Sequence, residues 1–157
     1  MRTLYSNQAA IEAEIAQADV VIGAVLVPGA SAPRLITRAM LGLMKPKAVL
    51  VDVAIDQGGC FETSHATTHE EPTYVVDGII HYCVANMPGS VPRTSSYALN
   101  NATLPYGLAL AGGGIAAIRN SPALLAGLST HQGKLTSQPV AEALGLPFTA
   151  PEVALAG

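Results

Sequence analysis

Apolar residues gather in three short runs along the chain, at residues 20–25 (VVIGAV), 48–54 (AVLVDVA) and 79–85 (IIHYCVA). Each run is rich in valine or isoleucine and is almost free of polar positions. Runs of this length and composition predict strands that are buried on both faces, as in a parallel sheet covered by helices.

Helical spacing accompanies the first two runs. Apolar residues recur at Ile11, Ile15 and Ala18 after a potential cap at Ser6, and residues 34–43 present a second apolar face. The order helix, strand, helix, strand predicts a βαβ unit with a crossover of ordinary length.

Outside these segments the sequence shows a polar region and then a helical pattern. Residues 61–76 are polar and rich in threonine, and they predict a surface excursion that ends in a short extended piece. After Pro92 the pattern is helical, with Pro105 expected to kink or split the helix and the glycines at 112–114 expected to allow a bend. Two short helices are predicted over residues 120–125 and 137–144, followed by a frayed tail after Pro147.

A loop follows each predicted strand: residues 26–30 (LVPGA), 55–59 (IDQGG) and 86–90 (NMPGS). If the strands are parallel and adjacent, the three loops lie along one edge of the sheet, where ligands bind in open α/β proteins. Asp56 places a carboxylate just past the second strand, followed by two glycines that permit a left-handed backbone or close approach of a ligand. Asp56 is therefore the first functional candidate. The alternative is a carboxylate that only caps its own turn.

Composition narrows the class of protein. A chain of 157 residues, half of them apolar and 12% charged, suits one globular domain. A net charge of -3 and few aromatic residues disfavour a nucleic-acid partner. The weakly polar stretches at 20–32 and 104–118 are interrupted and fall short of the roughly 20 residues of a membrane span. Without a signal-peptide core, and with only two cysteines, the sequence predicts a soluble cytoplasmic protein.

Other chemical candidates are weaker. His65 and His69 would share a face of a helix and could bind a metal, but Pro72 and the lack of further ligands disfavour this, so no metal site is expected. His81 and Cys83 lie within a predicted strand and are expected to be packed residues. The sequence lacks the motifs G-x-G-x-x-G, G-x-x-x-x-G-K-[ST] and G-x-S-x-G. These patterns alone therefore predict only part of a parallel α/β sheet, with residues suited to a ligand along one edge.

Four long sequence segments are more specific than these patterns, because they resemble a known family. They are DVVIGAVLVPGASAPRLIT, MKPKAVLVDVAIDQGGCFETS, YCVANMPGSVPRTSSYALNNATLPY and GLSTHQGKLTSQPVAEALGLPF. In this order and spacing they closely resemble the C-terminal half of bacterial alanine dehydrogenase. The proton-pumping nicotinamide nucleotide transhydrogenases are similar across the first two loops. That family has Glu in place of Asp56 and an Asp-Leu-Pro-like loop in place of residues 85–88, so the chain resembles alanine dehydrogenase more closely.

The resemblance implies the second half of a Rossmann-type, doubly wound parallel sheet (residues 1–91), followed by a C-terminal helical segment (residues 92–157) that packs on a substrate domain. It also implies that the strand-end loops hold NAD. Asp56 corresponds to the catalytic aspartate, near the nicotinamide and the substrate amine, and Asn86 to an amide that orients the nicotinamide ring. The matching cofactor-binding positions are Val25, Leu26, Val53, Ala54, Ile55, Asp56, Val84, Ala85, Asn86 and Met87.

The activity implied is the reversible, NAD-dependent oxidative deamination of L-alanine to pyruvate and ammonia, in a homo-oligomer that is commonly a hexamer. In that family the substrate-holding residues, the glycine-rich turn and the ribose-binding acid precede the region matched here. We therefore expect the chain to be a fragment that is inactive alone. The alternatives are a non-catalytic subunit that pairs with a separate N-terminal half, and a relic without function.

Overall fold

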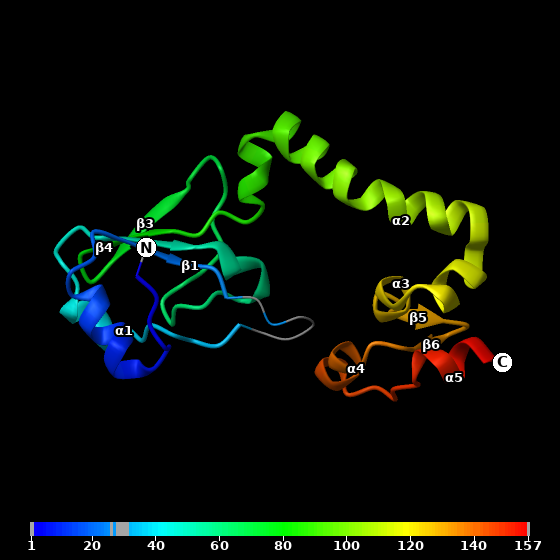
Figure 1. Cartoon of the computed structure of the whole chain (residues 1–157). Helices are drawn as coiled ribbons and strands as arrows, with labels where there is room; N and C mark the ends of the chain where they lie inside the picture. Colours follow the sequence, from blue (N-terminus) through cyan, green and yellow to red (C-terminus); the bar gives the residue numbers. More distant parts are fainter. Residues whose placement is uncertain (1, 26, 28–31, 157) are drawn as a thin grey trace. The chain divides into compact units, whose positions relative to one another are not determined.

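The computed structural model describes residues 2–25, 27 and 32–156, which divide into two compact units (Figure 1). The first unit ends at Ser90 and contains the sheet. The second begins at Val91 and contains most of the helical residues.

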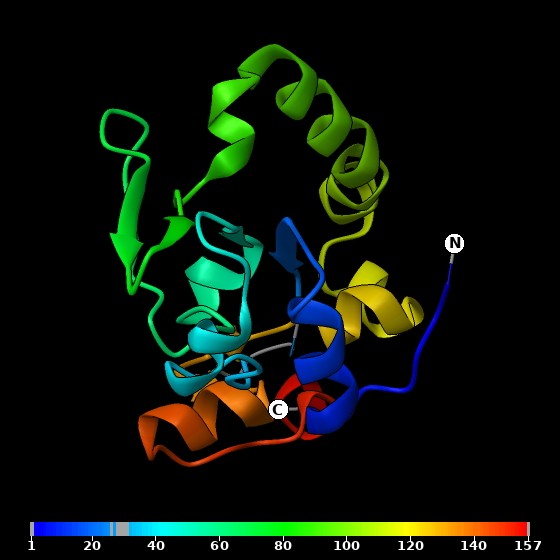
Figure 2. The ribbon, with the colours of Figure 1, turned by 90° about the vertical axis from the view of Figure 1, so that its left-hand side faces the viewer.

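A four-stranded sheet forms the first unit, in the order β1-β2-β4-β3 (Figure 2). The strands are β1 (Val20–Gly23), β2 (Val49–Asp52), β3 (Thr73–Val76) and β4 (Ile79–Tyr82). β1, β2 and β4 are parallel neighbours, with Val21 beside Leu50 and Leu50 beside His81. The prediction of three adjacent parallel strands is confirmed, so the segments that follow them start from one edge of the sheet.

One face of this sheet holds the core. Helix α1 (Gln8–Ile15), capped by the Asn7 side chain rather than by Ser6, contributes Ile15 to a buried cluster with Leu50 and Phe61. The opposite face is less protected, because Val20 and Ile22 of β1 are 54% and 65% exposed. The expectation of strands buried on both faces is therefore wrong for β1.

The predicted helix at 34–43 is also wrong, because only a 3-10 turn, η1 (Ala39–Leu43), forms there. Residues 35–36 are extended instead and pair with residues 60–62. The Leu35 N–H donates to the Cys60 carbonyl (2.7 Å), and the Glu62 N–H donates to the Ile36 carbonyl (2.8 Å). These bonds use backbone groups that a helix would need, while Ile36 still reaches the core.

The excursion at 61–76 ends in a true strand. β3 and β4 form an antiparallel hairpin through Asp77 and Gly78, whose φ angles are 50° and 82°. Two consecutive positive φ angles are what a tight hairpin turn requires, and Asp-Gly supplies them at low cost. The Asp-Gly dipeptide is a hairpin signal in the sequence, but it lies outside the apolar runs from which the strands were predicted.

The second unit is mostly helical. It contains α2 (Pro92–Asn120), α3 (Pro122–Ala126), the small hairpin β5 (Thr130–His131) and β6 (Lys134–Leu135), α4 (Gln138–Leu144) and α5 (Pro151–Ala156). The long helix continues through Pro105 and breaks at Gly114 (φ 50°, ψ -130°), so the glycines supply the predicted bend. The tail is not frayed, because Ala154 and Leu155 of α5 are buried. None of the helices in the described part of the chain is long and apolar enough to cross a membrane.

Candidate functional site

Asp56 lies on a tight turn at the carboxyl end of β2. The strand ends at Asp52 and leads directly into the 3-10 turn η2 (Val53–Gln57). Gly58 and Gly59 close this turn with φ angles of 87° and 78°, and their N–H groups donate to the carbonyls of Ile55 and Ala54, both at 3.0 Å. The turn exposes the Asp56 carboxylate and buries Ile55 and Ala54.

A hollow of about 310 Å³ lies between the ends of β1 and β2. Its lining comes from two segments and is mostly apolar, apart from one carboxylate and one amide: Ala24, Val25, Val53, Ala54, Asp56 and Gln57. Small-molecule sites commonly combine apolar walls with a few polar groups in this way. The hollow can therefore accept a flat, partly apolar group with a charged or polar atom facing Asp56.

The end of β4 lies beside the end of β2 on the same edge of the sheet. Val84 is fully buried, and Asn86 is exposed with a left-handed backbone (φ 57°), just before the 3-10 turn η3 (Met87–Ser90). Within the described residues, the side-chain amide of Asn86 makes no hydrogen bond. It is therefore available to a ligand.

The structure thus brings together part of the predicted set. Val25, Val53, Ala54 and Asp56 line one hollow. Ile55 points into the protein, and the residues after β4 do not belong to the described lining of that hollow. Leu26 lies outside the described residues.

The sequence interpretation overlooked Asp52, a fully buried carboxylate in the second apolar run. Its Oδ2 accepts hydrogen bonds from the backbone N–H groups of Cys60 (2.9 Å) and Phe61 (3.3 Å), and from the Ser64 hydroxyl (2.5 Å). A charge buried this deeply needs such donors. Asp52 therefore joins the start of η2 to the segment after it. The available signal was a charged residue inside a valine-rich strand.

Two glycines make room for this arrangement. A Cβ on Gly59 would lie 2.8 Å from Asp52 Oδ2 and 2.9 Å from the Ser64 Cβ. A Cβ on Gly23, at the end of β1, would lie 2.6 Å from the Phe61 ring. Both positions therefore exclude side chains, and both adjoin segments that line the hollow.

His81 and the two cysteines are packed residues. His81 Nδ1 donates to the Ile79 carbonyl (3.0 Å), so Nε2 accepts a hydrogen bond from the Thr63 hydroxyl (2.7 Å). Burial lowers the pKa of His81, which keeps the ring neutral. Burial, followed by the nearby Asp52 charge, raises the pKa of the Cys60 thiol to about 12. Cys83 is fully buried, so neither thiol has the exposure of a reactive cysteine.

The two candidate metal ligands have separate partners. The His65 ring stacks on Tyr74 with 3.7 Å between ring centroids, whereas His69 bonds to Asn86 and Ser90. In the described part of the chain, no group of three or more His, Cys, Asp or Glu residues could hold a metal ion.

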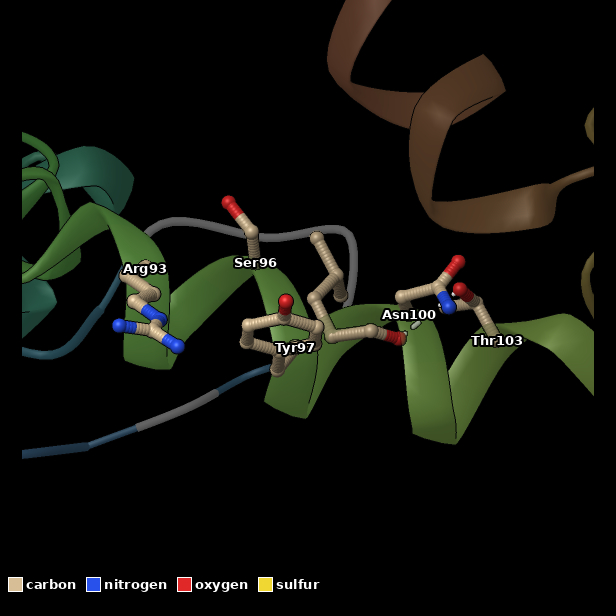
Figure 3. A pocket seen from close by; sticks show the side chains of 6 residues that line it. Arg93, Ser96, Tyr97, Asn100 and Thr103 are labelled. Atoms are coloured by element: carbon tan, nitrogen blue, oxygen red, sulfur yellow. Dashed lines mark hydrogen bonds between the residues drawn. The ribbon is translucent and has the colours of Figure 1, made fainter.

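A larger hollow, of about 560 Å³, runs along α2 in the second unit (Figure 3). Its described lining is Arg93, Ser96, Tyr97, Leu99, Asn100 and Thr103, all from one helix. None of its described lining residues belongs to the predicted site. We therefore place the candidate site at the strand ends of the first unit.

Parallel strands with polar loops at their carboxyl ends define the class of protein: part of a doubly wound α/β domain, a class in which ligands commonly bind at this edge. The chain belongs to the alanine dehydrogenase/PNT family, because the sequence of residues 1–138 matches the family described as "Alanine dehydrogenase/PNT, C-terminal domain".

Individual relatives agree with this assignment. The chain is 62% identical over 149 residues to an alanine dehydrogenase of Halomonas elongata, a match that covers 94% of the chain and 40% of the relative. It is 57% identical over 157 residues to an alanine dehydrogenase of Mycobacterium tuberculosis, covering 99% and 42%. The chain thus spans about two fifths of the length of these relatives.

Solved structures give the same result. A structure of L-alanine dehydrogenase is 49% identical, with a TM-score of 0.76 over 90% of this chain and 39% of that one. A transhydrogenase from Sinorhizobium meliloti is 37% identical, with a TM-score of 0.52 over 57% of this chain and 25% of that one. The likeness to the first is closer and covers more of the chain.

Proposed function

We propose that this chain supplies the nicotinamide-binding part of an NAD-dependent alanine dehydrogenase, which converts L-alanine and water to pyruvate and ammonia and also runs in reverse. The observation that carries the proposal is Asp56 at the rim of an apolar hollow between β1 and β2, in a chain 57–62% identical to two alanine dehydrogenases. The proposal includes a cytoplasmic location and a homo-oligomeric complete enzyme, a hexamer in the family that the sequence resembles.

The described residues suit one end of NAD. The apolar walls formed by Val25, Val53 and Ala54 match the faces of a nicotinamide ring, and the exposed amide of Asn86 can bond to a carboxamide. The hollow is too small for a whole dinucleotide. A pyrophosphate would be held by residues other than those described at this edge.

NAD⁺ supplies the chemistry of accepting a hydride from Cα of alanine. With a hydride removed from Cα, the substrate would carry a positively charged iminium, and the Asp56 carboxylate would stabilise this charge more strongly than it stabilises the neutral amine. Asp56 would then accept a proton from the water that attacks the iminium carbon. Asn86 would hold the nicotinamide ring in a fixed orientation.

A chimera tests this proposal. In the Halomonas elongata alanine dehydrogenase, the matching C-terminal part is replaced by this chain, and alanine-dependent formation of NADH is followed by absorbance. We expect activity comparable to that of the parent enzyme. A chimera that melts cooperatively, binds L-alanine and forms no NADH would contradict the proposal. If the fused protein does not fold, the chain is co-expressed with the remaining N-terminal part of the parent as a separate polypeptide.

A second candidate is a non-catalytic subunit that pairs with a separate N-terminal half. The exposed side chains of Val20 and Ile22 on β1 favour it, since they form an apolar surface suited to a partner. The co-expression experiment separates the two candidates: a complex without alanine-dependent NADH formation supports this one, and an active complex supports the enzyme.

A further inference from the structure

The segment after the Asp52 contacts continues along the end of β4. The Thr67 N–H donates to the Cys83 carbonyl (2.9 Å), and the Ala85 N–H donates to the Thr67 carbonyl (3.2 Å). These two bonds form a parallel bridge between Thr67 and Val84. The bridge fixes residues 67–69 beside the loop that carries Asn86.

His69 bonds to both ends of that loop. Its Nε2 lies 3.1 Å from the Asn86 carbonyl oxygen, and its Nδ1 lies 3.0 Å from the Ser90 hydroxyl. A carbonyl can only accept, so Nε2 carries the hydrogen, and in the neutral ring Nδ1 accepts from Ser90. The imidazole therefore connects the residue before η3 to the last residue of η3.

Asn86 needs such support because of its backbone. Its φ of 57° is uncommon for a residue other than glycine and costs free energy that its surroundings must offset. Its carbonyl oxygen accepts from the Gly89 N–H (2.8 Å) as well as from His69. These bonds fix the backbone and leave the side-chain amide without a partner among the described residues. The amide then projects from a fixed peptide.

Gly89 is also close to both groups. A Cβ there would lie 3.2 Å from Asn86 Nδ2 and 3.3 Å from His69 Nε2, which is tighter than an ordinary contact. The imidazole, the glycine and the amide are thus packed against one another. A displacement of the ring would be transmitted to Asn86.

We propose that His69 is a positioning residue: it holds the Asn86 turn in the conformation that presents the Asn86 amide to the nicotinamide. This inference rests on the proposed function, because it assigns His69 a task in the same site. His69 touches neither substrate nor cofactor, and it acts only through Asn86.

Two substitutions separate the two bonds of the ring. In His69→Gln the side-chain amide nitrogen can take the place of Nε2 and still donate to Asn86. In His69→Asn the shorter side chain reaches only the position of Nδ1, near Ser90. His69→Ala removes both bonds. The matched control is His65→Ala, an exposed histidine of the same segment that stacks on Tyr74 and has no bond to Asn86.

The first readout needs no activity. In the 157-residue chain, we expect hydrogen exchange of the Gly89 N–H to be faster by about tenfold in His69→Ala and His69→Asn, since the loss of one hydrogen bond is worth this much. It should be close to that of the unsubstituted chain in His69→Gln and His65→Ala. Unchanged exchange in His69→Ala would overturn the claim that His69 holds the turn.

The second readout is made in the chimera with the Halomonas part. We expect His69→Ala and His69→Asn to weaken NADH binding, followed by its fluorescence, by about tenfold and to raise KM for NAD⁺, with KM for L-alanine unchanged. His69→Gln should restore both values. Equal NADH binding by the unsubstituted and His69→Ala chimeras would overturn the inference and leave the proposed function intact. A folded chimera that neither binds NADH nor oxidises alanine would overturn both.

Discussion

The Ser64 hydroxyl donates to Asp52 Oδ2 across 2.5 Å, although twelve positions separate the two residues in the chain. This bond, together with those from the Cys60 and Phe61 N–H groups, ties the end of β2 to the segment beyond the Asp56 turn. The position of Asp56 thus depends on a carboxylate that does not itself face the hollow.

Asp52→Asn should destabilise the protein. The substitution removes a buried charge that accepts from four donors, and its amide can keep an acceptor at Oδ2 only by turning the NH₂ group toward the Cys60 thiol, so we expect the free energy of unfolding to fall by about 3 kcal/mol. Denaturant unfolding followed by circular dichroism measures this change. The control is Asp77→Asn, an exposed carboxylate paired with Arg38 at the surface, where we expect a much smaller loss. Equal losses for the two variants would contradict the role of Asp52.

Gly59→Ala and Gly58→Ala form a matched pair. Both glycines have positive φ, but among the described residues only the Cβ added at Gly59 would meet other atoms, 2.8 Å from Asp52 Oδ2. We expect Gly58→Ala to cost about 1 kcal/mol for the backbone alone, and Gly59→Ala at least about 2 kcal/mol more. Thermal melts of the two variants test the difference. If they melt together, steric contact with Asp52 is not what excludes a side chain at position 59.

Asp56→Asn in the chimera should reduce turnover far more than it weakens cofactor binding. An amide keeps the shape of the carboxylate but neither accepts a proton nor stabilises the iminium, so we expect kcat to fall by at least about 100-fold. Binding of NADH should change by less than about threefold, since the apolar walls of the hollow are intact. Steady-state kinetics and NADH fluorescence give the two values. Parallel losses of both would argue that Asp56 shapes the hollow rather than taking part in catalysis.

Stability should decline in mild acid because of His81. Burial lowers the pKa of His81 in the folded protein below the ordinary value of 6.5. As the pH falls through that value, the unfolded chain therefore binds a proton at this residue before the folded chain does. The free energy of unfolding should therefore be highest above that ordinary value and fall as the pH drops from about 7.5 to about 5.5. Urea unfolding at several pH values measures the slope. His81→Gln should flatten it.

The sequence predicted the three parallel strands and the place of Asp56 because both depend on local patterns. Valine-rich runs mark strands, and a polar turn after a strand falls at the ligand-binding edge. The pattern over residues 34–43 wrongly predicts a helix because Ile36 and Met40 have helical spacing. Their burial is real, but the segment pairs with residues 60–62, a contact between distant positions that periodicity does not reveal.

The supporting residues of the site were harder to find. Asp52 lies in an apolar run, and its importance depends on donors that come from the chain eight to twelve positions later. The sequence marks His69 only as a possible metal ligand, because its contact with Asn86 depends on the bridge between Thr67 and Val84. Val25 and Asp56 line the same hollow at the ends of two strands; the strand pattern predicts that they share one edge of the sheet, whereas their role in cofactor binding is implied only by resemblance.

The two-residue Asp77-Gly78 turn has a consequence for the order in which the sheet forms. β3 and β4 meet through contacts between near neighbours in the chain, and such hairpins close within about 10 µs. β1 and β2 must instead close the long connection between residues 24 and 48, and β2 must find β4 across residues 53–78. We therefore expect the hairpin to form first and to serve as the template on which β2, and then β1, assemble during folding.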